Sequence, residues 1–285
     1  MIRDLRKHEG DIFKGILNIS QVKGGNINSC FRLETVNDLY FVKVNTLSNY
    51  ADLFELEKKG LIFLKETSAF NIPRVISVGS DHELQWIIMT YINGARRKIN
   101  FWEDYGRTLA LMHQNSFESF GLHYNNYIGV LSQQNGKQDN WGAFFRENRI
   151  LPVLKEAEKK RLLRNEMRHL FDLMLDRVDG LFPKEKPSAL HGDLWSGNFM
   201  TDSNGQAAIF DPAVYYGHRE MDIGMTKLFG GFDQIFYDSY NETFPLEPDW
   251  EERVAIANIY PLLVHLVLFG RSYLNQVELA LKRFS

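Results

Sequence analysis

The sequence has a single cysteine, Cys30, among its 285 residues, so it contains no internal disulfide framework. Because folds that depend on disulfides belong mostly to oxidising compartments, we expect a cytoplasmic protein. Cys30 begins a predicted strand, and we interpret it as an inert small side chain rather than a redox switch.

An excess of either charge is also missing, with 33 Lys and Arg against 36 Asp and Glu. A net charge of −3 gives no basic footprint for nucleic acid or an anionic membrane. The N-terminus carries charges but no apolar core of a signal peptide. The longest apolar stretch, residues 255–270, is short and interrupted by Asn258 and Pro261, so we expect a buried helix rather than a membrane span. We therefore expect no nucleic-acid partner and no membrane.

Neither of the common phosphate-binding motifs, G-x-G-x-x-G or the P-loop lysine motif, is present. What stands out instead is His191-Gly192-Asp193, with Asn198 five positions after Asp193 and Asp211 at the end of a short apolar run. This spacing matches the catalytic loop of kinases, with Gly192 in place of an arginine. It predicts a phosphotransferase centre.

Phosphoryl transfer explains why these residue types are needed. Asp193 is predicted to accept a proton from the attacking hydroxyl and to orient it. Asn198 and Asp211 supply the amide and carboxylate oxygens that Mg²⁺ prefers. The alternative is structural: Asp193 and Asn198 would form an Asx-type turn, and Asp211 would cap a helix.

The first ninety residues predict mostly strands, at 16–22, 30–36, 39–44, 74–78 and 84–91. The loop after the first strand carries Gly24, Gly25 and Asn26, whose backbone N–H groups could lie over ATP phosphates. A plain hairpin is the default alternative for this loop.

Lys43 shares a face of its strand with Leu39 and Phe41, so its ammonium emerges among apolar side chains. The following helical pattern, residues 51–67, places Glu57 on its apolar stripe. Because a buried ammonium needs an anionic partner, we predict a Lys43–Glu57 ion pair that holds the lysine against the nucleotide phosphates. A snorkelling lysine and a solvated glutamate are the alternative.

The predicted strand at 84–91 leads into a mainly helical remainder, with helices predicted at 101–113, 141–147, 154–178, 220–229 and 251–269. We expect the adenine to meet the backbone at the crossing, at Met89, Thr90, Tyr91 and Ile92, although the edge strand could simply end there. Residues 121–140 suit a long, substrate-facing loop. The prediction is an α+β, two-lobed fold, with a small antiparallel β-sheet lobe (residues 1–92) and a larger helical lobe (residues 93–285).

Over nearly its whole length the sequence resembles the fructosamine kinases, also called ketosamine kinases. The resemblance rests on Gly24-Gly25-Asn26-Ile27-Asn28, Phe41-Val42-Lys43-Val44-Asn45, Phe54-x-x-Glu57-x-x-Gly60-Leu61, Asn126-Tyr127-Ile128-Gly129, His191-Gly192-Asp193-Leu194-Trp195-Ser196-Gly197-Asn198, Asp211-Pro212-Ala213-Val214-Tyr215-Tyr216-Gly217, Arg219-Glu220-x-Asp222, Leu228-Phe229-Gly230-Gly231-Phe232 and Leu262-Leu263-Val264-His265.

The resemblance implies a protein-kinase-like fold similar to aminoglycoside and choline kinases. It also implies ATP-dependent phosphorylation of the 3-hydroxyl of a ketosamine, free or protein-bound, whose product decomposes, so that the enzyme serves deglycation. The sequence departs from the family at Met89-Thr90-Tyr91, where a glutamate often precedes the aromatic residue, and at His218, where an acidic residue is expected and which could alter substrate preference.

Trp195 and Tyr215 could offer flat faces to the sugar ring, and buried packing is the alternative for both. No Ala-Pro-Glu follows Asp211, which favours a compact hydroxyl compound over a protein loop as acceptor. Two other functions remain open: a small-molecule kinase of the aminoglycoside or choline type, and a pseudokinase that acts as a binding module. The sequence leaves the preferred sugar and the oligomeric state undetermined.

Overall fold

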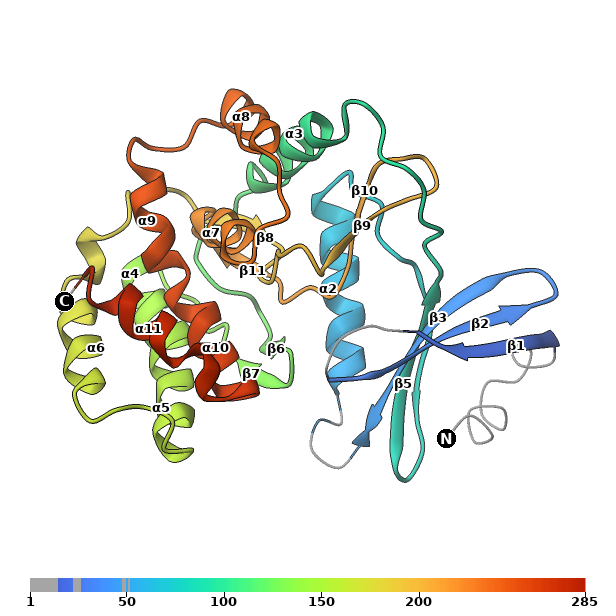
Figure 1. Ribbon diagram of the computed structural model, residues 1–285, viewed down its shortest axis with the longest axis horizontal. Coiled ribbons are helices and arrows are strands. Elements are labelled where there is room, and N and C mark those ends of the chain that lie inside the picture. The colour runs from blue at the N-terminus through green and yellow to red at the C-terminus, as the bar shows by residue number, and fades with distance from the viewer. Residues whose placement is uncertain (1–14, 23–26, 48–49, 51, 285) are drawn as a thin grey trace.

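The computed structural model describes residues 15–22, 27–47, 50 and 52–284. It confirms the α+β class, with a five-stranded antiparallel sheet at one end and helices at the other (Figure 1). The sheet strands are β1 (Ile16–Gln21), β2 (Ser29–Thr35), β3 (Leu39–Thr46), β4 (Val75–Ser80) and β5 (Leu84–Thr90). The helices are α2 (Leu53–Thr67), α3 (Phe101–His113), α4 (Trp141–Phe144), η3 (Phe145–Ile150), α5 (Leu151–Lys159), α6 (Met167–Asp176), η4 (Val178–Gly180), α7 (Glu220–Leu228), α8 (Gln234–Thr243), α9 (Trp250–Ala257), α10 (Ile259–Phe269), η5 (Arg271–Tyr273) and α11 (Leu274–Leu281).

The sheet has the strand order β1-β2-β3-β5-β4, and its two faces are packed differently. Val42 and Val44 lie in one apolar cluster with β2 and β5 residues. On the other face, Phe41 packs with Ile87 and Met89 against the apolar side of α2. Because side chains alternate along a strand, Lys43 points to the same face as Phe41, toward α2.

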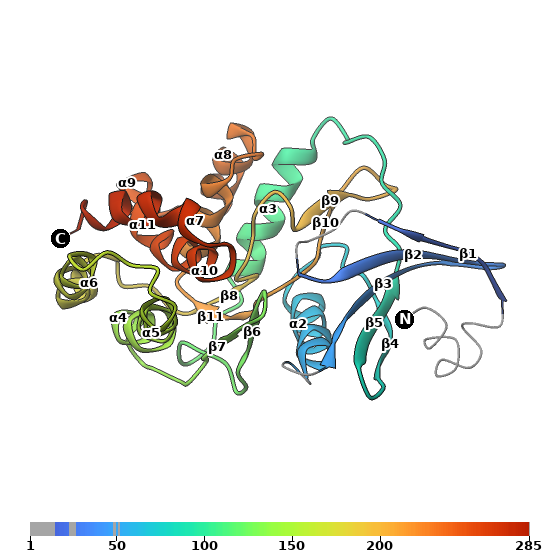
Figure 2. The same cartoon turned by 60° about the horizontal axis from the view of Figure 1, so that its bottom comes forward.

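Three two-stranded sheets lie beyond the five-stranded sheet and carry the polar motifs. They pair β6 (Asn126–Ile128) with β7 (Leu131–Gln133), β8 (Ser188–Leu190) with β11 (Tyr215–Gly217), and β9 (Phe199–Thr201) with β10 (Ala207–Ile209). In Figures 1 and 2 these short strands lie between the sheet end and the helical end of the molecule. The residues that join β8 to β9 and β10 to β11 are therefore placed between the two.

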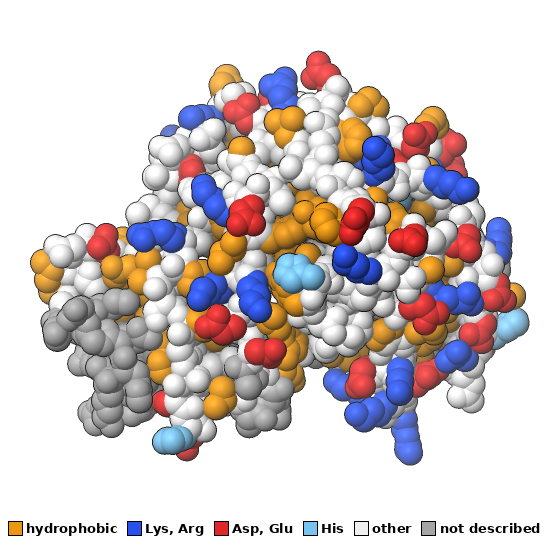
Figure 3. Space-filling model, turned by 180° about the vertical axis from the view of Figure 1, so that it is seen from behind, with side chains coloured by type: hydrophobic (Ala, Val, Ile, Leu, Met, Phe, Trp, Pro, Cys, Tyr) orange, Lys and Arg blue, Asp and Glu red, His pale blue; other side chains and the backbone are white. Residues whose placement is uncertain are grey.

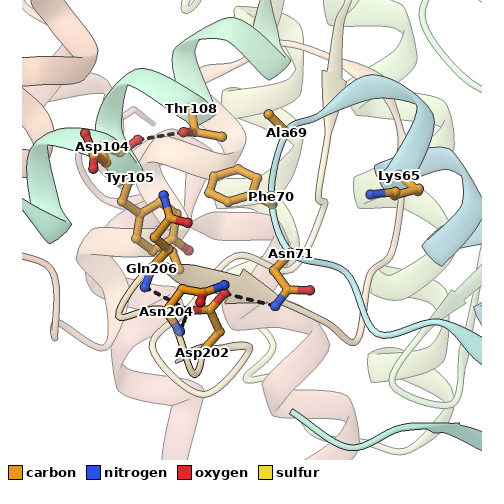
Figure 4. A pocket seen from close by; sticks show the side chains of 11 residues that line it. Lys65, Ala69, Phe70, Asn71, Asp104, Tyr105, Thr108, Asp202, Asn204 and Gln206 are labelled. Atoms are coloured by element: carbon orange, nitrogen blue, oxygen red, sulfur yellow. Dashed lines mark hydrogen bonds between the residues drawn. The ribbon is translucent and has the colours of Figure 1, made fainter. Parts of the chain in front are cut away.

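The β9–β10 hairpin is fixed to the segment after α2 by a buried carboxylate. Asp202, 2 % exposed, accepts hydrogen bonds from the side chain of Asn71 at 3.0 Å and from the backbone N–H groups of Asn204 and Gln206 at 2.8 and 2.9 Å. These residues line a cavity of about 340 Å³ beside α3 (Figure 4). The clamp ties the hairpin that separates Asn198 from Asp211 to the first part of the chain.

Two of the predicted elements are wrong. Residues 154–178 are not one helix, because α5 ends at Lys159 and Arg161 adopts a left-handed φ of 54° before α6 begins. Residues 121–140 are not a loose loop, because they contain the β6–β7 hairpin, whose Asn126 and Gln133 are buried.

The apolar stretch near the C-terminus belongs to α9 and α10, which meet at Asn258. Helical residues Trp250–Phe269 are long and apolar enough to cross a membrane, but 61 % of the most apolar window is buried inside the molecule. This is the behaviour of a core helix. On the face seen in Figure 3, side chains of both charges are interspersed over the surface.

The proposed lobe boundary between residues 92 and 93 stays a prediction. The last strand of the large sheet ends at Thr90 and the next helix begins at Phe101, so the predicted boundary falls in the connection between them.

Candidate functional site

The loop between β8 and β9 holds the predicted base, and its backbone turns sharply at Gly192. Gly192 has a φ of 83°, and a Cβ atom there would lie 2.0 Å from the carbonyl oxygen of Ala213. An arginine, the residue that kinases carry at this place, does not fit. The neighbouring His191 is fully buried, and its Nε2 donates to the carbonyl of Phe210 at 3.0 Å.

Asp222 lies in the first turn of α7 and supports this loop through hydrogen bonds. Its carboxylate accepts hydrogen bonds from the backbone N–H of His191 at 2.7 Å and of Gly192 at 2.9 Å. The same carboxylate pairs with the buried His113 at 3.3 Å, and His113 also bonds the hydroxyl of Tyr240. Asp222 is 1 % exposed, so this support is shielded from water. It anchors the residues directly before Asp193.

Asp193 and Asn198 are in contact, as the motif predicts. The side-chain amide of Asn198 donates to the carboxylate of Asp193 at 2.9 Å and to its backbone carbonyl at 2.8 Å. Burial raises the pKa of the Asp193 carboxyl to about 7, against the lowering effect of the Asn198 hydrogen bond, and the charges of Asp211 and Asp222 raise it further. A carboxylate with a pKa near neutrality is suited to accept a proton.

Asp211 is brought to the same place by its backbone neighbours. The N–H of Phe210 donates to the carbonyl of Asn198 at 3.1 Å, and the N–H of Ala213 donates to the carbonyl of His191 at 2.9 Å. Asp211 itself has a left-handed φ of 58°, which few side chains adopt. These bonds place Asp211 beside the loop of Asp193 and Asn198. The structural alternative, a helix cap, is excluded because α7 begins only at Glu220.

The predicted Lys43–Glu57 ion pair is present. The ammonium of Lys43 lies 2.7 Å from the Glu57 carboxylate and also contacts Asp211. Burial alone would lower the pKa of Lys43, but the carboxylates of Asp211 and Glu57 outweigh it and raise that pKa, so the lysine stays charged. The snorkelling alternative is wrong, because Lys43 is 4 % exposed.

Helix α2 is seated directly on the Asp211 segment. A Cβ atom at Gly60 would lie 3.0 Å from the ring of Pro212, so the small residue allows this close approach. Gly60 is one turn after Glu57, which means that the same contact sets the position of the Lys43 partner. Five predicted residues, the set Lys43, Glu57, Asp193, Asn198 and Asp211, thus form one connected cluster.

The predicted adenine contacts are only partly available. The side chain of Met89 is buried against apolar residues of α2. Its backbone pairs within the sheet, with Phe41 on one side and Val75 on the other. Thr90 and Tyr91 donate their backbone N–H groups to Arg74 and Leu39. Within the described part of the chain, Ile92 makes no backbone hydrogen bond, so its N–H and carbonyl are available to a base. Gly24, Gly25 and Asn26 lie outside the described residues.

The two predicted sugar-binding rings have different environments. Trp195 is half-buried beside Asp193 and remains a candidate. Tyr215 is 1 % exposed, and its ring packs on the guanidinium of Arg149 and on Phe144. Its proposed contact with substrate is therefore wrong, and packing is its role.

His218 is also packed in the interior of the molecule. It is fully buried, bonds the carbonyl of Pro183 at 3.1 Å and lies among the rings of Trp141 and Phe182. Its side chain therefore has no exposed surface for a direct substrate contact, and an effect on substrate preference stays a prediction. Cys30 is buried too, and burial raises the pKa of its thiol, which agrees with an inert role.

Sequence reasoning missed Asp222 and the β6–β7 hairpin as supports of the site. In that hairpin Gln133 donates to the carbonyl of Ala213 and Asn126 to the carbonyl of Val214, both at 2.9 Å. The buried Arg149 in turn donates to Asn135 at 2.9 Å. These side chains hold the segment after Asp211. The signal available in the sequence was the high frequency of Asn and Gln in this region, because amides that become buried need hydrogen-bond partners.

The oxygen atoms of the Asn198 amide and the Asp211 carboxylate fit a magnesium ion whose other ligands are phosphate oxygens and water. Both Asn198 amide hydrogen bonds use the nitrogen, and the described residues show no hydrogen bond to its oxygen. No group of three or more His, Cys, Asp or Glu side chains in the described residues could hold a metal alone. Mg²⁺ characteristically takes one or two protein oxygens and completes its shell with water and phosphate.

Comparison with known proteins agrees with this geometry. The fructosamine kinase family model matches residues 1–284. A protein of Enterococcus faecium named "probable ketoamine kinase" is 37 % identical over 266 residues, which cover 92 % of this chain and 94 % of that protein. The crystal structure of a fructosamine-3-kinase homologue from Thermobifida fusca superposes with a TM-score of 0.83 at 31 % identity, covering 94 % of this chain and 93 % of that one.

More distant structures share the fold alone. An aminoglycoside phosphotransferase crystallised with AMP-PNP and hygromycin B has a TM-score of 0.62 at 15 % identity, covering 98 % of each chain. The fold is thus that of protein kinases and aminoglycoside phosphotransferases, as predicted. Because the family model spans the chain and the relatives are similar over nearly their whole length, the chain belongs to the fructosamine kinase family of ATP-dependent phosphotransferases.

Proposed function

We propose that this protein transfers the γ-phosphoryl group of ATP to the 3-hydroxyl of a ketosamine, the rearranged adduct of a sugar with an amine. The observation that carries the proposal is the contact of Asp193 with Asn198, beside the contact of Lys43 with Asp211. It places a partly buried carboxylate, whose pKa burial raises to about 7, in the same cluster as a cation and a second carboxylate. Family membership supplies the class of acceptor.

Each residue has a separate task in this reaction. Asp193 accepts the proton of the sugar hydroxyl as the hydroxyl oxygen attacks, and the hydrogen bond from Asn198 keeps the carboxylate oriented. Lys43 binds the nucleotide phosphates, and Glu57 keeps its ammonium directed toward the Asp211 side of the cluster. Asp222 acts on the reaction only through the loop that it positions.

Asn198 and Asp211 are the residues that would hold Mg²⁺. Bound there, the ion supplies neutralisation of the charge on the transferring phosphoryl group. We expect Asp211→Ala to abolish activity together with its Mg²⁺ dependence, and a variant that still responds to Mg²⁺ would place the metal elsewhere.

The product is expected to be unstable and to release the free amine, so that the reaction serves deglycation of small or protein-bound amines in the cytoplasm. The test is to incubate the protein with Mg²⁺, ATP and a fructosamine or ribulosamine of lysine, and to follow the product by ³¹P NMR and mass spectrometry. A 3-phosphate that decays to free lysine supports the proposal. A phosphate on another hydroxyl, or a stable product, contradicts the deglycation step.

A further inference from the structure

A series of five aromatic rings leads away from the catalytic loop, and only the first of them, Trp195, is a candidate contact for the sugar. We call this set the aromatic wall; it consists of Trp195, Phe229, His265, Phe269 and Tyr273. Successive ring centroids are 5.6 Å apart from Trp195 to Phe229, 5.0 Å from Phe229 to His265, 5.4 Å from His265 to Phe269 and 5.1 Å from His265 to Tyr273. Phe229 is 37 % exposed and Phe269 40 % exposed, so the wall is open to solvent.

The wall is joined to the catalytic loop by the turn after α7. Gly230 and Gly231 have φ values of 69° and 95°, and a Cβ atom at Gly231 would lie 2.7 Å from the Cβ of Ser196. Two consecutive left-handed residues let the chain reverse against the loop. Phe232 then enters the core beside Phe199, whereas Phe229 stays outside beside Trp195.

His265 gives the wall one polar atom with a defined character. Its Nδ1 lies 2.7 Å from the carbonyl oxygen of Pro261, which can only accept, so Nδ1 carries the hydrogen. Burial lowers the pKa of this imidazole, which keeps it neutral. Its Nε2 is then a bare acceptor, and the described residues show no hydrogen bond to it.

In a ketosamine the amine is attached to C1 and the reacting hydroxyl to C3, two carbons away. The nitrogen is a secondary amine that is protonated at neutral pH, so it offers N–H donors and a positive charge. A neutral imidazole acceptor and aromatic faces suit this group, because rings attract cations and an imidazolium would repel them. The apolar rings farther along suit a methylene chain.

We propose that the aromatic wall binds the amine-derived half of the substrate, with the protonated amine at His265 and its hydrocarbon chain against the rings farther along. Nε2 of His265 accepts a hydrogen bond from the protonated amine, and the methylenes of that chain lie against Phe229 and Phe269. This inference rests on the proposed function, because it requires the sugar to be placed at Asp193.

The test compares two adducts of one sugar, one with Nα-blocked lysine and one with methylamine, which has no chain. For the wild type we expect a lower KM for the lysine adduct. Phe269→Ala is expected to raise that KM about tenfold, with kcat and the KM for ATP unchanged, and to change the KM for the methylamine adduct less than about twofold. His265→Phe keeps a ring but removes the acceptor, and is expected to raise the KM for both adducts.

Phe117→Ala is the matched control, because Phe117 is also exposed, at 44 %, and stacks on Tyr216 outside the wall. It should leave both KM values unchanged, and thermal melting should show that all three variants are folded. Equal effects of Phe269→Ala on the two adducts, or none on either, would overturn the inference while leaving the proposed function intact. A wild type that phosphorylates neither adduct would overturn the proposed function itself.

Discussion

The carboxylate of Asp222 accepts the backbone N–H of Gly192 at 2.9 Å, so the first turn of α7 supports the catalytic loop one residue before its base. The other carboxylate oxygen accepts from His191 and pairs with His113. Both oxygens are therefore used as acceptors in a buried place. Such a group cannot be replaced by one that donates.

We expect Asp222→Asn to lower kcat by about 10²-fold or more, because the new amide N–H₂ would face backbone donors and displace the loop. ATP affinity should change little, since the Lys43–Glu57 pair does not contact Asp222. Steady-state kinetics with nucleotide titration separates the two effects. An unchanged kcat would show that the loop does not depend on this support.

Gly192→Ala is expected to destabilise the protein by about 2–4 kcal/mol and to lower activity. Its φ is left-handed, and the added Cβ would meet the Ala213 carbonyl, which cannot retreat without moving the Asp211 segment. Gly180→Ala is the control, because nothing lies within 4 Å of a Cβ there, and its effect should be within about 0.5 kcal/mol. Denaturant unfolding measures both, and equal stabilities of the two variants would refute this reason for the glycine.

Asp193→Asn should lower kcat by about 10²–10⁴-fold with little loss of ATP affinity, as expected for a positioned base. In the wild type, kcat/KM should rise with pH through about 7, because only the deprotonated carboxylate accepts the proton. A rate that is flat between pH 5 and 9 would remove Asp193 from this role.

The same carboxyl predicts a change in stability with a defined sign. Its folded pKa of about 7 lies above the unfolded value of about 3.9, so the folded state binds more protons between these values and loses stability as pH rises through them. Asp193→Asn removes this cost and should stabilise the protein by about 2 kcal/mol at pH 8, with no gain at pH 4. Thermal melts at the two pH values decide this, and a gain of equal size at both would contradict an Asp193 carboxyl that titrates near pH 7 in the folded protein.

Glu57→Gln should weaken ATP binding and lower kcat/KM for ATP by about tenfold or more, because Lys43 would lose an anionic partner in a buried place. Glu55→Gln, on the exposed side of the same helix, is the control and should be neutral. Nucleotide titration by calorimetry measures both, and equal affinities would leave the pair without a role in binding.

The sequence predicted the centre of the site well because its signals are local or periodic. The fixed spacing of the motif identifies Asp193, Asn198 and Asp211, and the strand and helix periods alone predict that Lys43 lies opposite Glu57. Asp222 was not among the predicted site residues, because it acts from 31 positions beyond His191 through a contact that only tertiary packing creates.

Errors arose where alternatives were equal on pattern alone. In the sequence, a buried tyrosine cannot be told from one that stacks on a sugar. Only the structure shows that Tyr215 is buried and packs on Arg149. The charged run after residue 154 favoured one long helix, but the chain turns at Arg161 to pass from α5 to α6. The frequent Gly, Asn and Gln residues at 121–140 favoured a loop. The sequence does not show that two of these amides, those of Asn126 and Gln133, bond to the distant carbonyls of residues 214 and 213.

The most direct test of the account is ATP consumption by the purified protein with Mg²⁺, comparing a ribulosamine or fructosamine of lysine with choline and with an aminoglycoside. The account predicts turnover with the ketosamine, none with the other two, and its loss in Asp193→Asn. Turnover only with choline or the aminoglycoside would contradict the proposed acceptor, and ATP binding without turnover of any of the three would contradict the assignment as an active kinase.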